Sequence, residues 1–315
     1  MRLNDTERVS RSDDESADVS DRERANRPDG DRKQSDQSER QGGATESGHD
    51  PTVDSAVLAE DLSISYAPDA DPVVECERLD VPEGEVTGLV GPNGSGKSTL
   101  LKALSDHLDP DRGSVYLHGR EVQSYDQKEL ARELGHLSQE NDSPGSITVE
   151  ELVYHGRYPH RGVFESVDET DREAVERALD LAGVAHLRDQ NVDSLSGGQK
   201  QLAWIAMVLA QDTDVLLLDE PTTFLDLHHQ LGVLETVQRL NREKGVTVAV
   251  VLHDISQAAR FADYLVALDD GEIYDWGPSE EVVSEQLLAD VFEVEAAVSY
   301  EPELQILPKR AIRDR

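Results

Sequence analysis

The sequence has a single cysteine and no long apolar run. Cys76 alone excludes an internal disulfide and a cysteine-based metal cluster, so we expect a small buried or half-buried thiol. No stretch approaches the roughly 20 apolar residues that span a bilayer, and residues 1–20 contain no apolar block of signal-peptide type. We therefore expect a protein that is made and kept in the cytosol.

Basic residues are also scarce. The chain has 30 Lys and Arg against 66 Asp and Glu, a formal net charge of −36, so we expect no nucleic-acid partner. Two interpretations of the acidity remain: a solvated surface suited to very high internal salt, as in halophiles, or docking of a basic partner. The charge is spread along the whole chain, which favours the first and predicts a loss of stability in dilute buffer.

Composition divides the chain into three parts. Residues 1–54 are a low-complexity mixture with almost no aliphatic or aromatic side chains, and we expect a disordered acidic N-terminal extension that serves as a solvated leader. A tail that binds a partner is the alternative for this segment. From Ala56 onward, short apolar runs alternate with turns. The prediction is one folded domain over 55–294, followed by a C-terminal tail over 295–315.

The folded part reads as an α/β domain. Four apolar runs are expected to form strands, several of them buried on both faces as central parallel strands are: 85–91, 114–119, 214–220 and 246–254. Helical patterns occupy the intervals between or after them: 97–108, 168–183, 199–211 and 227–245. This alternation predicts helices that cover a mostly parallel sheet, and residues 54–84 predict an added antiparallel piece.

A phosphate-binding loop follows the first central strand and opens a helix, in the pattern G-x-x-x-x-G-K-[ST]. Its glycines allow backbone N–H groups to point at phosphate oxygens, and the helix N-terminus adds partial positive charge. Lys97 is expected to bind the β and γ phosphates, and the Ser98 hydroxyl to bind Mg²⁺. The predicted ATP-binding loop comprises Gly91, Pro92, Asn93, Gly94, Ser95, Gly96, Lys97, Ser98 and Thr99.

Two carboxylates end the apolar run 215–218. Parallel strands deliver their carboxyl ends to the edge of the sheet that carries the phosphate loop. Asp219 is then expected to hold Mg²⁺, directly or through water, and Glu220 to accept a proton from the attacking water. An isolated acidic pair is more often a solvated turn or a cap, but the phosphate loop makes that alternative weak.

The run Leu195-Ser196-Gly197-Gly198-Gln199 resembles the signature sequence of the ABC family of ATPases. Its hydroxyl, glycine amides and helix N-terminus suit an anion. In that family this surface caps the γ-phosphate of the ATP held by the opposite subunit. The resemblance implies the ABC-type nucleotide-binding fold, with a parallel-sheet core, an antiparallel β subdomain and an α-helical signature subdomain. It also implies a head-to-tail dimer with a second ATPase subunit.

Further positions are assigned by this resemblance alone. Gln139 matches the glutamine that reaches Mg²⁺ and the attacking water, and His253 matches the switch histidine that contacts the γ-phosphate. Asp226, after Leu225, matches the loop that crosses the dimer interface. Tyr66 matches the aromatic residue that stacks on adenine, although a tyrosine in a strand often serves only packing.

Four segments are similar in sequence to ATPases of iron–siderophore, haem and cobalamin importers, most of all to the ferric siderophore group. They are 156–160, 204–211, 221–230 and 251–263. The resemblance implies a peripheral subunit on the cytoplasmic face of the membrane. Its expected partners are a multi-span permease, which contacts residues 140–160, and indirectly an extracellular substrate-binding protein. Cobalamin and haem stay open as alternative cargoes.

Two rivals to the importer are a soluble ABC ATPase acting on DNA or ribosomes, and an inactive regulatory subunit. No heptad run separates the phosphate loop from the signature, which disfavours the genome-maintenance type. Phe224 and Leu202 depart from the commoner family residues but remove no catalytic group. Because Lys97, Glu220 and His253 are all present, we predict an active ATPase.

Overall fold

A computed structural model describes the part of the chain that follows the predicted N-terminal extension. Of the extension, only Asp54 belongs to the described residues. Short stretches after Tyr66, after Gln139 and near the C-terminus also lie outside them. The domain boundaries at 54 and 294 stay predictions. The described residues are 54–67, 70–139, 145–162, 165–301 and 304–312.

Parallel strands form the centre of the main sheet, in the order β9-β3-β8-β7-β6. Every residue of β3, β7 and β8 is buried. Strands with both faces covered need apolar side chains at every position, which is why these segments read as continuous apolar runs. The strands are β3 (Val86–Val90), β6 (Leu134–Leu137), β7 (Val215–Asp219), β8 (Thr247–Val251) and β9 (Tyr264–Asp269).

The other half of the sheet is largely antiparallel, in the order β5-β4-β1-β2-β10, and β10 pairs antiparallel with β9. The predicted antiparallel piece, 54–84, is confirmed as β1 and β2. The predicted strand at 114–119 overlaps β4 and pairs with β1 rather than joining the parallel core. The strands are β1 (Ser55–Ile64), β2 (Val74–Pro82), β4 (Arg112–Leu117), β5 (Arg120–Glu121) and β10 (Glu272–Pro278).

Local signals set where several helices begin and end. Asp168 and Ser196 each form a reciprocal capping box at the start of α4 and α5. Gly245, with φ 70°, ends α6 in the left-handed conformation that glycine adopts easily. The helices are α1 (Lys97–Leu104), α2 (Gln127–Glu133), α3 (Val149–His155), α4 (Glu169–Leu181), α5 (Gly197–Ala210), α6 (Leu227–Lys244), α7 (Ile255–Phe261), α8 (Ser279–Val282) and α9 (Glu285–Asp290).

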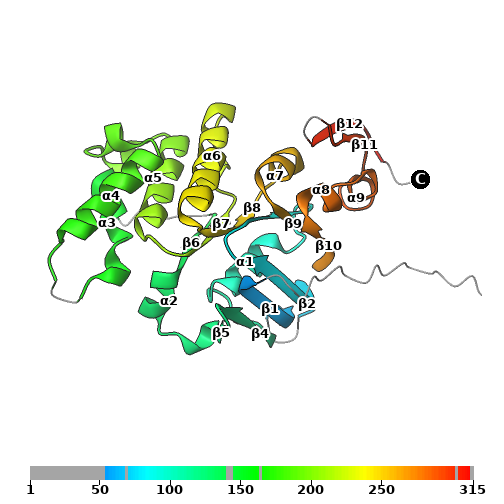
Figure 1. Ribbon diagram of the computed structural model, residues 1–315, viewed down its shortest axis with the longest axis horizontal. Helices are drawn as coiled ribbons and strands as arrows, with labels where there is room; N and C mark the ends of the chain where they lie inside the picture. Colours follow the sequence, from blue (N-terminus) through cyan, green and yellow to red (C-terminus); the bar gives the residue numbers. More distant parts are fainter. Residues whose placement is uncertain (1–53, 68–69, 140–144, 163–164, 302–303, 313–315) are drawn as a thin grey trace, which may run out of the picture. The chain divides into compact units, whose positions relative to one another are not determined.

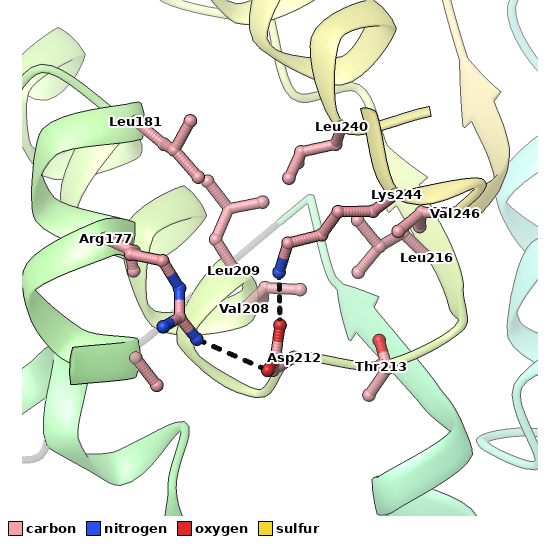
Figure 2. A pocket seen from close by; sticks show the side chains of 12 residues that line it. Arg177, Leu181, Val208, Leu209, Asp212, Thr213, Leu216, Leu240, Lys244 and Val246 are labelled. Carbon is pink, nitrogen blue, oxygen red and sulfur yellow. Dashed lines mark hydrogen bonds and ion pairs between the residues drawn. The ribbon is translucent and has the colours of Figure 1, made fainter. Parts of the chain in front are cut away.

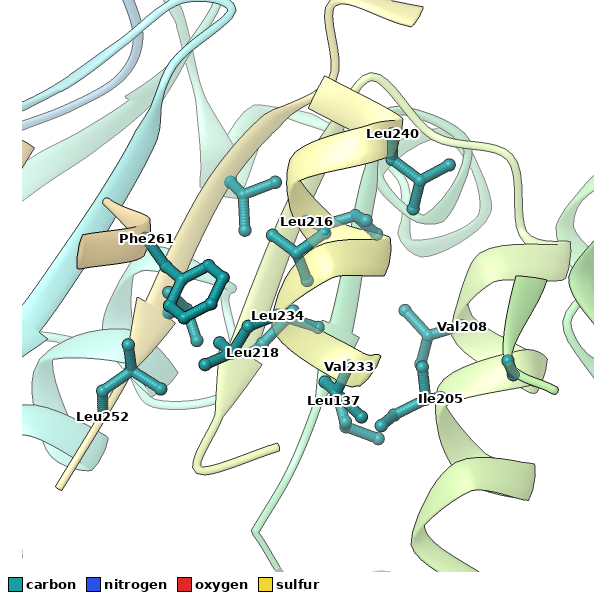
Figure 3. Packing of buried hydrophobic residues seen from close by; sticks show 14 of the residues in the cluster. Leu137, Ile205, Val208, Leu216, Leu218, Val233, Leu234, Leu240, Leu252 and Phe261 are labelled. Atoms are coloured by element: carbon teal, nitrogen blue, oxygen red, sulfur yellow. The ribbon is translucent and has the colours of Figure 1, made fainter. Parts of the chain in front are cut away.

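The sheet separates two apolar cores. Because side chains alternate along β7, Leu217 packs with α1 and the antiparallel strands, whereas Leu216 and Leu218 pack with α5, α6 and α7. Figure 3 shows Leu218 and Leu234 near Phe261 in the second core, and Ile205 and Val208 approaching from α5. Each fully buried leucine contributes about 2 kcal/mol of transfer free energy. In Figure 1, α3, α4 and α5 lie together, apart from α1.

The predicted C-terminal tail, 295–315, contains most of a β-hairpin. Strands β11 (Val294–Ser299) and β12 (Gln305–Ala311) pair antiparallel, and β11 packs against α9. The sequence analysis did not predict this hairpin, or β9 and β10. Across the described segments, no helix has the length and apolar character needed to cross a membrane.

Candidate functional site

The phosphate loop joins β3 to α1 and depends on glycine. Gly91 and Gly96 have φ of 149° and 93°. A Cβ at Gly91 would lie 2.2 Å from the Leu268 carbonyl oxygen, and one at Gly96 would lie 2.5 Å from a methyl group of Val74. The Leu268 carbonyl group and the Val74 side chain therefore leave no room for a side chain at these two positions of the loop. In the described structure, no side chain caps the start of α1, which suits an anion there.

Lys97, the first residue of α1, is 5% exposed. Its Nζ donates to the carbonyl oxygens of Gly91 at 3.0 Å and Pro92 at 2.7 Å, so these two bonds hold the loop against the ammonium group. Burial lowers the pKa of Lys97, and the nearby carboxylates of Glu220 and Asp219 oppose that shift. A phosphate would supply the compensating negative charge that the buried ammonium group lacks.

The pleat of β7 brings Asp219 to the phosphate loop. Val215, Leu217 and Asp219 point to the α1 side of the sheet, and the Asp219 carboxylate accepts a hydrogen bond from Ser98 at 2.8 Å. Asp219 is fully buried, and its Oδ2 has no hydrogen-bond partner within the described residues. Burial raises the pKa of this carboxyl, and the bond from Ser98 opposes the shift. A carboxylate oxygen is thus held inside the protein with no partner among the residues that the structure describes.

Three side chains converge on the other carboxylate, Glu220. Its Oε2 accepts hydrogen bonds from Gln139 Nε2 at 2.7 Å and Thr223 Oγ1 at 3.1 Å, and lies 2.6 Å from His253 Nε2. Gln139 follows β6, and His253 follows β8, so the strands on either side of β7 deliver both groups. This arrangement can orient a carboxylate, a water molecule and a proton.

The backbone at Glu220 is strained. Its φ of 51° lies in the left-handed region, where a residue with a Cβ is disfavoured by about 1 to 3 kcal/mol. The turn directs the side chain away from the strand, although Asp219 precedes it directly. The sequence analysis did not identify Thr223 as a site residue, because a threonine near the end of a strand has no distinguishing sequence pattern.

Tyr66 lies beyond the end of β1, and its side chain is 62% exposed. Its hydroxyl forms a hydrogen bond with Thr99 Oγ1 at 2.9 Å. Tyr66 is thus near the phosphate loop, with most of its ring accessible. Of the other loop residues, Ser95 is buried, Pro92 is half-buried and Asn93 and Gly94 are exposed.

The signature residues occupy the start of α5. Ser196 is exposed, and its Oγ accepts from Gln199 N at 3.3 Å, while Gln199 Oε1 accepts from Ser196 N at 3.1 Å. A Cβ at Gly198 would lie 3.2 Å from Leu225, so the loop before α6 packs closely against α5. In the described residues, Ser196 and Gln199 form no hydrogen bond with the phosphate loop. The chain brings the phosphate loop and the acidic strand together, and leaves the signature apart.

Asp226 caps α6 and accepts hydrogen bonds from the backbone N of His229 at 3.0 Å and from its Nδ1 at 2.8 Å. These bonds lower the pKa of the Asp226 carboxyl. On either side stand two exposed apolar residues, Phe224 and Leu227, with exposed fractions of 81% and 66%. Phe224 also has a φ of 66°.

The fold and the site define a P-loop ATPase domain. A family model described as ABC transporter matches residues 76–223. The chain is 49% identical over 230 residues to the ferric enterobactin transport ATP-binding protein FepC of Escherichia coli K12, covering 73% of this chain and 85% of that protein. It is 41% identical over 247 residues to the iron(3+)-hydroxamate import ATP-binding protein FhuC of Bacillus subtilis 168, covering 78% and 91%.

Solved structures agree with these relatives. A metal-chelate type ABC transporter in an inward-facing conformation superposes with a TM-score of 0.69 at 27% identity, covering 82% of this chain and 98% of that one. A bacterial ABC transporter cassette solved as a dimer gives a TM-score of 0.64 at 29% identity, covering 71% and 98%. The chain belongs to the family of ABC transporter ATP-binding proteins. It binds ATP and is an ATPase.

Proposed function

We propose that this ATPase energises the uptake of an iron(III)–siderophore complex. The observation that carries the proposal is the identity of 49% and 41% to FepC and FhuC over most of their length, since both are named for ferric siderophore or hydroxamate transport. Haem and cobalamin are the alternative cargoes. In such a system the ATPase does not contact the cargo, so the import role and the cargo are separate claims.

Nucleotide binding would use the phosphate loop and Tyr66. Gly91 to Thr99 surround the site that the phosphates would occupy, and Lys97 would exchange its bonds to the loop carbonyls for phosphate oxygens. The exposed ring of Tyr66 would stack on adenine. The hydrogen bond between Tyr66 and Thr99 supports this assignment, because it ties the ring to the loop.

The oxygen ligands fit Mg²⁺. The partnerless Oδ2 of buried Asp219, the Ser98 hydroxyl and the Gln139 amide oxygen are all hard oxygen donors. We propose that these residues hold Mg²⁺ together with the nucleotide phosphates. When bound, the ion would neutralise charge on the phosphates.

Glu220 would act as the general base. His253, Gln139 and Thr223 surround its carboxylate at hydrogen-bond distance and would orient both the carboxylate and the attacking water. Lys97 would stabilise negative charge that develops on the γ-phosphoryl group. The strained backbone of Glu220 supports this role, because such strain is concentrated at functional sites.

We propose a head-to-tail dimer in which the signature of one subunit, Ser196 to Gln199, completes the site of the other. Within the described residues the signature forms no hydrogen bond with its own phosphate loop, and Phe224 and Leu227 expose apolar surface beside Asp226. Burial of that surface against a second subunit would favour closure on ATP. The dimeric state of a related cassette supports the arrangement.

The dimer would lie on the cytoplasmic face of the membrane beneath a multi-span permease, with an extracellular binding protein that delivers the cargo. Of the predicted docking segment, 140–160, residues 145–160 are described and expose Tyr158. A soluble, non-transport ATPase is the weaker alternative. The charge of −36 further supports a protein adapted to high salt and without a nucleic-acid partner.

The test is ATP hydrolysis in concentrated KCl, with and without the permease reconstituted in lipid vesicles, and with a cargo-loaded binding protein. Stimulation by the loaded ferric siderophore receptor is the expected result. Stimulation by only a haem or cobalamin receptor would overturn the cargo and keep the importer. Strong hydrolysis that no membrane partner alters would favour the soluble alternative.

A further inference from the structure

A buried arginine supports the turn that exposes Tyr158. The short 3₁₀ turn η2 (Tyr158–His160) follows α3 directly, and the Tyr158 side chain is 75% exposed. The preceding residue, Arg157, is only 4% exposed. Arginine is seldom buried to this degree without a specific set of acceptors, so its partners indicate what it does.

Those partners lie on two other helices. Arg157 Nε donates to Asp171 Oδ1 of α4 at 3.0 Å, and its Nη1 donates to the carbonyl oxygen of Ala210, the last residue of α5, at 2.8 Å. The Asp171 side chain is also buried, at 6% exposure. The planar guanidinium group donates in two directions at once and thus fixes η2 relative to both helices.

Neighbouring contacts strengthen this attachment. His160 Nε2 donates to the carbonyl oxygen of Gln211 at 2.7 Å, and the Gln211 side chain donates to Leu134 O at 3.1 Å. From α2, Arg132 donates to the carbonyl oxygen of Pro159 at 2.8 Å. The turn is therefore attached to the end of α5 and, through α2 and β6, to the central sheet.

The opposite end of α5 carries the signature. With 14 residues and a rise of about 1.5 Å per residue, α5 extends roughly 20 Å from the Ser196 cap to Ala210. Ala203, Ile205 and Ala206 are buried along it, so the middle of the helix is held in the apolar core. Helix α3, which precedes η2, also packs against α5, and the bond from Arg157 to Ala210 adds a direct link from η2 to the end of that helix.

We propose that Arg157 is a positioning residue that couples a membrane partner's contact at η2 to the signature end of α5. This inference rests on the proposed importer function. In the described structure the hydrogen-bond partners of Arg157 are Asp171, Ala210 and Gln211, and none of them belongs to the proposed nucleotide site, so Arg157 would act on the coupling between the two events rather than on hydrolysis itself. We therefore expect substitution of Arg157 to change how strongly the permease stimulates ATP turnover.

The test variant is the double substitution Arg157→Met with Asp171→Leu. Removing one partner alone would leave a buried charge unpaired, whereas replacing both with apolar side chains of similar size is often tolerated. The double variant loses the bond to Ala210, and with Asp171 it also loses that residue's half of the reciprocal cap of α4 and the ion pair to Arg161. The melting temperature of the full chain is measured alongside to establish that it folds.

A matched control at the same end of α5 is Asp212→Asn. Figure 2 shows Asp212 between Arg177 of α4 and Lys244 of α6, with ion-pair distances of 3.5 and 2.6 Å. The substitution breaks ion pairs beside Gln211 without touching Arg157. It therefore reports on a general loosening of this end of α5.

The assay compares ATP turnover of each full-length variant alone and with the membrane subunit that co-purifies with the wild-type chain, in phospholipid vesicles. For the double variant we expect basal turnover and KM for ATP within about two-fold of wild type, and stimulation reduced about five-fold or more. Asp212→Asn should retain wild-type stimulation.

Undiminished stimulation of the double variant would overturn the proposal. Equal losses of basal and stimulated turnover, with a lower melting temperature, would also overturn it, because the pair would then serve only folding. Equal loss of stimulation in Asp212→Asn would assign the effect to the helix end in general and not to Arg157. If the wild-type chain itself is not stimulated, the importer function fails first, and this inference fails with it.

Discussion

The buried histidine of β6 gives a prediction with a magnitude. The ring of His136 stacks at an angle on His107, with centroids 4.4 Å apart, and within the described structure neither of its buried ring nitrogens has a hydrogen-bond partner. Burial, followed by repulsion from His107 and Lys102, lowers the pKa of His136 from 6.5 to about 3. The folded protein therefore holds this side chain neutral down to an acidic pH.

The sign of the effect follows from proton binding. Above pH 6.5 the ring is neutral in both states, and His136 causes no pH dependence. Below that value the unfolded chain binds a proton that the folded protein does not, so the free energy of unfolding falls by about 1.4 kcal/mol per pH unit. Between pH 7 and pH 5 the loss is about 2 kcal/mol, and it continues towards pH 3.

The assay is denaturant unfolding of wild type and His136→Phe at pH 7 and pH 5, at constant KCl. Phenylalanine keeps a ring and cannot titrate. We expect the stability advantage of the variant to be about 2 kcal/mol larger at pH 5 than at pH 7. Carboxylates that titrate in this range are common to both proteins, so their effect cancels in the difference. An advantage that is the same at both pH values would refute the reasoning.

Further predictions concern the site and the surface. Glu220→Gln should keep ATP binding, trap a closed dimer and slow hydrolysis by about 10² to 10⁴; hydrolysis at the normal rate would remove Glu220 from the mechanism. Lys97→Ala should raise the Kd for ATP by about tenfold or more in a binding titration, because a charge-assisted contact is lost. Phe224→Asn removes exposed apolar surface, and asparagine adopts the left-handed backbone conformation readily. Sedimentation should therefore show weaker ATP-dependent dimerisation, and the melting temperature should not fall. Raising KCl from about 0.1 M to about 1 M should raise the melting temperature by screening like charges, and an unchanged melting temperature would contradict this.

The buried centre of the fold was predictable because it leaves an unambiguous pattern. Strands β3, β7 and β8 are covered on both faces, so their sequences are continuous apolar runs. The phosphate loop follows β3 and the acidic pair ends β7, and because these strands run parallel, both motifs lie at the same edge of the sheet. The edge hairpin β11 and β12 escaped prediction, since β12 is mostly exposed and its sequence does not alternate. Strand β9 has a buried apolar run and could have been recognised.

The site was predictable in its residue types but not in its contacts. Gln139 and Glu220 stand 81 positions apart and meet only because β6 lies beside β7 in the sheet, which no local pattern records. The left-handed backbone of Glu220 and the bond from Thr223 depend on the tertiary structure as well. Arg157 lies in a segment that the family resemblance singled out, but its burial and its two acceptors are set by the tertiary structure.

The two carboxylates illustrate why this site gives up stability for function. Asp219 is fully buried, one of its oxygens has no partner in the described part of the chain, and Glu220 beside it has a strained backbone. Neither feature improves folding, because burial of a charged group and a left-handed residue both disfavour the folded state. Both make sense if a cation and a phosphate complete the site. Nucleotide binding should then stabilise this edge of the sheet more than any other part of the domain, since only there does it remove an existing penalty.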